Sequence, residues 1–217
     1  MTPGLTVAGR TDAGVHAVGQ VVSAADVPDD ADVERLMASL NSICGPSIVV
    51  HSCRRAPDEF NARFDARSRT YVYAIHTGAL ADPWLALTSW HHPGPLDVDA
   101  MAEAAGHLLG RRDFSSFGRL PSPEASAERT LYELACSIAG SIVRVTARAD
   151  AFIQQMVRSL VGTLATVGEG KMQPGDLPSV LAARDRGAAG PVAPPHGLCL
   201  VSVEYDDGWS QPFDPFE

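Results

Sequence analysis

Apolar positions in this sequence follow two spacings, one typical of β-strands and the other of amphipathic helices. Strict alternation is clearest over residues 71–75, where Tyr71, Tyr73 and Ile75 fall on one side. Gly140 separates two β-branched runs and predicts a hairpin. Short apolar and β-branched runs predict further strands over residues 5–8, 20–24, 48–53, 130–139, 141–148 and 198–205.

Three- and four-residue spacing of apolar side chains predicts helices over residues 32–40, 96–109, 151–167 and 174–184. Asp32 stands at the N-cap position of the first of these helices. The most regular apolar stripe belongs to residues 151–167 and contains Phe152, Met156, Leu160, Thr163 and Val167. Helices and strands are interspersed along the chain, so we expect the α/β class, in its α+β form.

Composition and cysteine usage narrow the class of protein. The chain has 217 residues, of which 45% are hydrophobic and 20% charged, as in globular proteins. No stretch approaches the roughly 20 apolar residues of a membrane span. Cys44, Cys53, Cys136 and Cys199 form no CxxC pair, and the adjacent His91 and His92 have no partner ligand at a suitable spacing. We therefore expect reduced thiols, a cytoplasmic location and no metal site.

Arginines concentrate in two segments although the net charge is −9. Arg54, Arg55, Arg63, Arg67 and Arg69 form one group, and Arg111, Arg112 and Arg119 the other. Arginine fits phosphate groups and aromatic rings stack on unpaired bases, so residues 60–71 could contact nucleic acid. A solvated surface would have the same charge pattern, and the sequence leaves both interpretations open.

A glycine-rich segment, GRTDAGVHA, spans residues 9–17 between the first two predicted strands. Asp12 lies near the tip of this predicted loop. Loops on a rigid scaffold often contain catalytic groups, yet an aspartate in a turn can also bind backbone N–H groups without any catalytic role. Physical reasoning from these residues alone does not choose between the two.

Five segments together resemble the TruA-type tRNA pseudouridine synthases. They are GRTDAGVHA at residues 9–17, Arg69-Thr70-Tyr71, the loop at residues 113–118, the segment 151–158, and APPHGL at residues 193–198. The resemblance implies two ferredoxin-like subdomains with largely antiparallel sheets that flank a central catalytic cleft. We expect an N-terminal subdomain at residues 1–95, a C-terminal subdomain at 96–206 and a flexible tail at 207–217.

The resemblance also implies roles for individual residues. Asp12 corresponds to the family's catalytic carboxylate, Arg158 to its ion-pair partner, and Tyr71 to the tyrosine that lies against the target base. Without the resemblance, Arg158 could equally be a surface arginine on a helix. The implied substrate contacts are Arg10, which fills the space of the flipped base or holds the next phosphate, Leu198 beside the base, and Arg63, Arg67 and Arg69 on the RNA backbone.

Substrate and assembly follow from the same resemblance. We expect isomerisation of uridine to pseudouridine in the anticodon stem-loop of tRNA, without cofactor or metal, by a homodimer with one tRNA across both subunits. Family members have several dozen residues before the GRTDAG loop, which begins here at Gly9. A second hypothesis is therefore a catalytically inactive RNA-binding remnant, while a hydrolase using Asp12 lacks a Ser/His or metal constellation.

Overall fold

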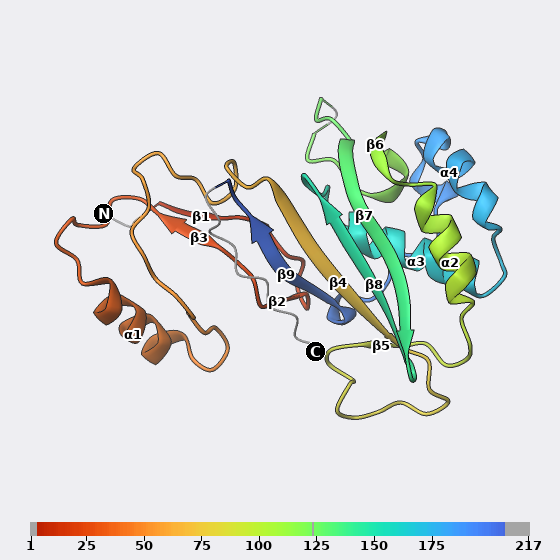
Figure 1. Cartoon of the computed structure of the whole chain (residues 1–217), viewed down its shortest axis with the longest axis horizontal. Helices are drawn as coiled ribbons and strands as arrows, with labels where there is room; N and C mark the ends of the chain where they lie inside the picture. Colours follow the sequence, from red (N-terminus) through yellow and green to blue (C-terminus); the bar gives the residue numbers. More distant parts are fainter. Residues whose placement is uncertain (1–3, 123, 207–217) are drawn as a thin grey trace. The chain divides into compact units, whose positions relative to one another are not determined.

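The computed structural model describes residues 4–122 and 124–206, and its contacts divide the chain into two compact units (Figure 1). Unit 1 comprises Met1–Ala8 and Val21–Asp65, and unit 2 comprises Gly9–Gln20 and Ala66–Glu217. The predicted tail at residues 207–217 lies outside the described residues.

Unit 1 contains one strand pair and one helix. Strand β1 (Leu5–Val7) pairs antiparallel with β3 (Val22–Ala24), so the first two predicted strands are confirmed. Helix α1 (Val33–Cys44) begins at Asp32, whose carboxylate accepts the N–H groups of Glu34 and Arg35 at 3.0 Å. The predicted N-cap is therefore confirmed, and the helix runs four residues beyond its predicted end.

The prediction of a strand at residues 48–53 is wrong. This segment is irregular, and Ile48 and Val49 are exposed. The N–H of Val50 donates to Oδ1 of Asn41 at 2.6 Å, and Nδ2 of Asn41 donates back to the carbonyl of Val50 at 3.0 Å. An asparagine side chain thus occupies the groups that a neighbouring strand would use, and β-branched residues favour a strand only where a partner exists.

Unit 2 is built on a seven-stranded sheet with the order β2-β9-β4-β8-β7-β6 and with β5 beside β4. The β2–β9 and β4–β5 pairs are parallel and the remaining pairs are antiparallel. This mixture of helices with a mainly antiparallel sheet confirms the predicted α+β class. The strands are β2 (His16–Ala17), β4 (Ser68–His76), β5 (Trp90–His91), β6 (Gly110–Asp113), β7 (Glu128–Ala139), β8 (Ile142–Ala149) and β9 (Leu198–Glu204).

Four of these strands and two helices make a βαββαβ arrangement, β4-α2-β7-β8-α3-β9, with the strand order β9-β4-β8-β7. That order is typical of ferredoxin-like folds. Figure 1 shows the helices α2 (Val98–Gly106), α3 (Met156–Gly168) and α4 (Leu177–Ala183) together on one side of the sheet. The subdomain boundary predicted near residue 95 falls between β4 and α2, and it stays a prediction, as does a central cleft.

The core of unit 2 lies between the sheet and the helices. Tyr73 and Ile75 on β4 are fully buried, as the alternating pattern predicted. The helix predicted over residues 96–109 is present as α2, and its apolar stripe of Met101, Ala104 and Ala105 is buried together with Leu108, which follows the helix. The β7–β8 hairpin is confirmed as well, with Gly140 in its turn at a φ of +59° that favours glycine. Four short 3₁₀ turns complete the unit: η1 (Ser115–Phe117), η2 (Pro174–Asp176), η3 (Arg186–Ala188) and η4 (Pro195–Gly197).

Helix α3 begins five residues later than predicted. The carbonyl of Gln154 accepts the N–H of Arg119 at 2.9 Å in an isolated antiparallel bridge, so this part of the chain pairs with a neighbouring segment. Gln155, at the N-cap position, has a φ of +65°. A non-glycine residue in that conformation is strained and interrupts a helix. The apolar spacing of residues 151–155 therefore belongs to a packed segment that is not helical.

Candidate active site

The loop at residues 9–20 belongs to unit 2, where hydrogen bonds close its base and attach its C-terminal end to the sheet. The side-chain amide of Gln20 accepts the N–H of Gly9 at 3.3 Å and donates to the carbonyl of Gly9 at 2.7 Å, which closes the loop at its base. The N–H groups of Val18 and Gly19 both donate to the carbonyl of Leu200 on β9. The loop is thus held on the seven-stranded sheet, which gives it a rigid support.

A tight turn at the tip of this loop positions Asp12. The N–H of Val15 donates to the carbonyl of Asp12 at 3.1 Å, and Gly14 adopts a φ of +83°. A side chain at residue 14 would be strained and would also approach Pro195 within 3.2 Å. The turn therefore uses the backbone of Asp12 and leaves its carboxylate available for other contacts.

The Asp12 carboxylate forms an ion pair with Arg158 on the first turn of α3. Nη1 of Arg158 donates to Oδ2 of Asp12 at 2.8 Å, and the two side chains are 13% and 26% exposed, respectively. Within the described residues, Oδ1 of Asp12 has no hydrogen-bond partner. A half-buried carboxylate with one oxygen bound and one oxygen available is suited to act on a substrate.

The guanidinium of Arg158 is fixed from a second direction. Its Nε donates to the carbonyl of Ala193 at 2.7 Å, and the N–H of Ala193 donates to the carbonyl of Arg158 at 3.0 Å. These bonds hold the APPHGL segment at residues 193–198 against α3. An arginine that is mostly buried is stable only when its charge and its N–H groups are paired, and this one is bound to both a carboxylate and a carbonyl. Arg158 is therefore oriented by the fold before any substrate arrives.

Tyr71 on β4 lies near Asp12. Its ring contacts the ring of Phe152 edge-on, with centroids 5.2 Å apart, and 8% of the residue is exposed. Burial raises the pKa of Tyr71 to about 12, the neighbouring Arg69 opposes this rise, and the charge of Asp12 adds to it. The phenol is consequently neutral at physiological pH and can donate a hydrogen bond near the carboxylate.

Tyr73, which the sequence indicated only as a core residue, also supports the site. Its hydroxyl donates to the carbonyl of Pro194 at 2.7 Å. A Cβ on Gly197 would lie 2.6 Å from the Tyr73 ring, so the chain passes against this ring where only glycine fits. Leu198, predicted to contact the base, begins β9 opposite Tyr73 and is 6% exposed in the free chain.

The arginines predicted to bind the RNA have four different surroundings. Arg10 is exposed on the Asp12 loop. Arg67 is exposed and pairs with Asp206, its Nε donating to Oδ1 at 2.7 Å. Arg69 is buried, and its Nη1 donates to the carbonyls of Ala66 and Asp150 at 3.2 and 2.7 Å. Arg63 belongs to unit 1, where its guanidinium lies 5.5 Å from the centroid of the Phe64 ring.

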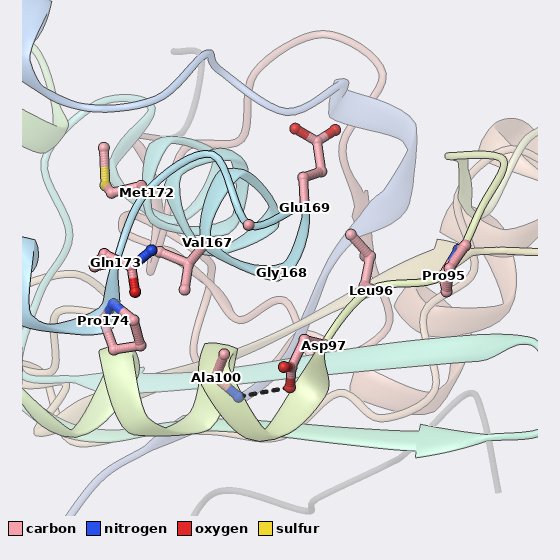
Figure 2. Close-up of a pocket in the computed structure, with 11 residues that line it drawn as sticks. Pro95, Leu96, Asp97, Ala100, Val167, Gly168, Glu169, Met172, Gln173 and Pro174 are labelled. Carbon is pink, nitrogen blue, oxygen red and sulfur yellow. Dashed lines mark hydrogen bonds between the residues drawn. The ribbon is translucent and has the colours of Figure 1, made fainter.

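A hollow of about 540 Å³ lies at the other end of α3 (Figure 2). Its lining includes Leu96, Asp97, Gly168 and Glu169. The dashed line in Figure 2 marks the bond from the N–H of Ala100 to the Asp97 carboxylate, at 2.9 Å. The carboxylate of Glu169 is already engaged, because it binds other side chains with both of its oxygens.

Two absences concern only the part of the chain that the structure describes. No helix there is long and apolar enough to cross a membrane. No group of three or more His, Cys, Asp or Glu side chains there is arranged to hold a metal ion.

Comparison with known proteins gives one consistent family. A profile described as tRNA pseudouridine synthase matches residues 104–206. The chain is 45% identical over 201 residues to tRNA pseudouridine synthase A of Rhodopseudomonas palustris (strain BisA53), covering 92% of this chain and 81% of that protein. The protein of the same name from Moorella thermoacetica is 42% identical, with 91% and 80% covered, and that from Bordetella petrii 41%, with 96% and 81%. The chain therefore belongs to the tRNA pseudouridine synthases, a family of isomerases.

Proposed function

We propose that this chain converts uridine to pseudouridine in the anticodon stem-loop of tRNA, with Asp12 as the catalytic carboxylate. The observation that supports this proposal most directly is the ion pair of Asp12 with Arg158, which leaves one carboxylate oxygen of Asp12 available beside Tyr71. The reaction breaks the bond from the ribose to the base nitrogen, turns the uracil, and joins the ribose to carbon five. The product is an isomer of the substrate, and the proton of carbon five passes to water.

In this mechanism Asp12 acts at the sugar, either by attack on it or by removal of a sugar proton through a glycal. Arg158 keeps Asp12 oriented throughout, because its Nη1 donates to Oδ2 of the carboxylate at 2.8 Å. Tyr71 lies against the uracil through its exposed edge. Its hydroxyl, with a pKa near 12, acts as a neutral donor toward the base when the reaction begins.

The target base has to leave its stack before it can reach Asp12, which costs roughly a few kcal/mol. Arg10, exposed two residues before Asp12, fills the vacated space or binds the adjacent phosphate. Leu198 packs beside the flipped base, and Arg63, Arg67 and Arg69 contact the RNA backbone. We further propose a cytoplasmic homodimer, which size-exclusion chromatography with light scattering would test.

The decisive experiment measures tritium release from tRNA labelled at carbon five of uridine. We expect release by the wild-type chain and a loss on the order of 10³-fold or more in Asp12→Asn, because removal of a reacting group leaves only binding and orientation. Affinity for tRNA should be equal or higher in Asp12→Asn, since Arg158 then presents an uncompensated positive charge. Asp99→Asn, which alters an exposed aspartate on α2, is the matched control and should retain full activity.

Replacement of uridines by cytidine tests the substrate. We expect product to disappear from a transcript in which the anticodon stem-loop uridines are replaced, and to persist when uridines of the T-loop are replaced instead. Retained turnover in Asp12→Asn would overturn the catalytic role. Binding of tRNA by the wild-type chain without tritium release would favour the RNA-binding remnant.

A further inference from the structure

Two arginines outside the Asp12 site lie on segments that pack against each other. The 3₁₀ turns η1 and η3 are in contact, and the hydroxyl of Ser116 joins them. It accepts the N–H of Asp185 at 3.1 Å and donates to the carbonyl of Val180 at 2.7 Å. Arg119 follows η1 by two residues and Arg186 is the first residue of η3, so the same packing brings both arginines to one place.

Each arginine is attached to a segment that leads into the Asp12 site. The N–H of Arg119 donates to the carbonyl of Gln154 at 2.9 Å, four residues before Arg158. Nη1 of Arg186 donates to the carbonyl of Gly190 at 2.9 Å, three residues before Ala193. Arg158 is bonded to Ala193 and also binds the Asp12 carboxylate. The two arginines are therefore positioned by the same scaffold as the candidate active site.

No carboxylate neutralises these two arginines among the residues that the structure describes. Arg184, two residues before Arg186, pairs with Asp113 at 3.0 Å, whereas neither Arg119 nor Arg186 forms such a pair. Partial burial lowers the pKa of Arg186, and the positive charge of Arg119 lowers it further, so each guanidinium lies in the other's field. Neighbouring like charges are unfavourable unless an anion lies between them.

We propose that Arg119 and Arg186 together bind a backbone phosphate of the RNA substrate. The proposal rests on the proposed function, because the phosphate would belong to the strand that presents its uridine to Asp12. Paired guanidinium groups suit phosphate oxygens well. In a chain of net charge −9, RNA can be held only at local positive sites, and a pair without carboxylates beside the active-site scaffold is such a site.

The test compares Arg119→Gln, Arg186→Gln and the double variant with the wild-type chain. Affinity for an unmodified tRNA transcript is measured between 50 and 200 mM NaCl. Each lost phosphate contact makes the slope of log affinity against log salt shallower by about one unit, so that affinity falls about fourfold less between 50 and 200 mM NaCl. Because both arginines bind the same phosphate, we expect each single variant to bind several-fold more weakly, the double variant to lose about one unit of slope in total, and turnover at saturating tRNA to be unchanged.

Arg111→Gln is the matched control, because Arg111 is an exposed arginine already paired with Glu128 at 2.9 Å. It should leave affinity and salt slope unchanged. Arg186→Gln removes a bond to the Gly190 carbonyl and could perturb the fold, whereas Arg119→Gln breaks no side-chain bond within the described residues. We therefore expect Arg119→Gln to melt at the wild-type temperature or above, since a repulsion is relieved.

An unchanged salt slope in both Arg119→Gln and the double variant would overturn this site, even if the wild-type chain makes pseudouridine. A wild-type chain that binds tRNA without making product would overturn the proposed function, and the salt slopes would still decide whether Arg119 and Arg186 contact the backbone. Absence of tRNA binding by the wild-type chain would overturn both.

Discussion

Each end of helix α3 has an ion pair that includes a carboxylate, but the two carboxylates differ in how many of their oxygens are bound. At the first turn, Arg158 binds one oxygen of Asp12 and leaves the other without a hydrogen-bond partner among the described residues. At the last turn, the hollow of Figure 2 has a volume of about 540 Å³, but Glu169 binds His92 and Lys171, at 2.7 and 2.8 Å. Space alone does not indicate chemistry. The useful difference is a carboxylate that is held in place and still able to accept a substrate group.

Substitution of the basic partner at the first end should produce the largest effect. In Arg158→Met we expect kcat/KM to fall on the order of 10³-fold, because Asp12 loses its oriented partner and the Ala193 carbonyl loses its donor. Stability should fall by about 2 kcal/mol, less than for a fully buried pair because Asp12 is partly exposed. Tritium release and urea unfolding measure the two effects.

Glu169→Gln at the other end is the matched comparison. It removes one charge from a pair of similar exposure, yet Glu169 lies at the end of α3 opposite to Arg158. We expect unchanged kcat/KM and a loss of stability below about 1 kcal/mol. Equal activity losses in Arg158→Met and Glu169→Gln would show that both act through general stability, and the contrast between the two ends would then fail.

Substitution of the glycines of α3 should produce the second largest difference between the two ends of the helix. A Cβ on Gly162 would lie 1.8 Å from the carbonyl oxygen of Pro191, so the segment that leads to Ala193 can pack on α3 only with glycine here. A Cβ on Gly168 would meet the flexible side chain of Met101, at 2.8 Å from its sulfur. Gly162→Ala should therefore destabilise the chain by about 3 kcal/mol and lower activity through displacement of Ala193.

Gly168→Ala is the control at the opposite end of the helix. The Met101 side chain can change rotamer, and alanine favours helix over glycine by roughly 1 kcal/mol. We expect its melting temperature to remain within a few degrees of the wild type and its activity to be unchanged. A Gly162→Ala chain as stable and active as Gly168→Ala would mean that the 190s segment can move away from α3 without consequence.

Much of the fold could be predicted from residue patterns, because the strands and helices that pack in unit 2 have regular periods. Alternation marked β4, and the stripe of Met101, Ala104 and Leu108 marked α2. The start of α3 could not be predicted in this way. Residues 151–155 continue the apolar spacing of the helix, but Gln154 pairs with Arg119, which is distant in the sequence. The two-residue strands β2 and β5 are also defined only by their partners.

The candidate site shows the same division. Resemblance to a family pointed to Asp12, Arg158 and Tyr71, whose side chains the structure brings near one another, while their catalytic roles stay predictions. Periodicity gave no signal for the amide of Gln20 that closes the loop, or for the Tyr73 hydroxyl on Pro194. Such support consists of single hydrogen bonds between segments far apart in sequence, and no local pattern encodes it.

Substitution of one ionisable group near each end of α3 should produce the smallest difference between the two ends, and it concerns the dependence of stability on pH. Burial raises the pKa of Tyr71 from 10.0 to about 12 near the first turn, and that of Cys136 from 9.0 to about 12 beside Asp97. The folded chain holds both protons more tightly than the unfolded chain. Their contribution to stability is therefore complete at neutral pH and is lost as the pH rises toward 12, with Cys136 losing it from about pH 9 and Tyr71 from about pH 10.

Tyr71→Phe should thus weaken the fall in unfolding free energy between pH 10 and 12, by about 2 kcal/mol for a shift of this size. It should also lower turnover at pH 8 about tenfold, since the neutral donor near Asp12 is gone. Cys136→Ala should flatten the alkaline fall beginning near pH 9 and leave turnover unchanged. Urea unfolding at several pH values and tritium release at pH 8 separate the two variants. If Tyr71→Phe changed the alkaline stability but not turnover, Tyr71 would contribute to the fold alone, as we expect of Cys136, and the chemistry at the first turn of α3 would rest on Asp12 and Arg158 alone.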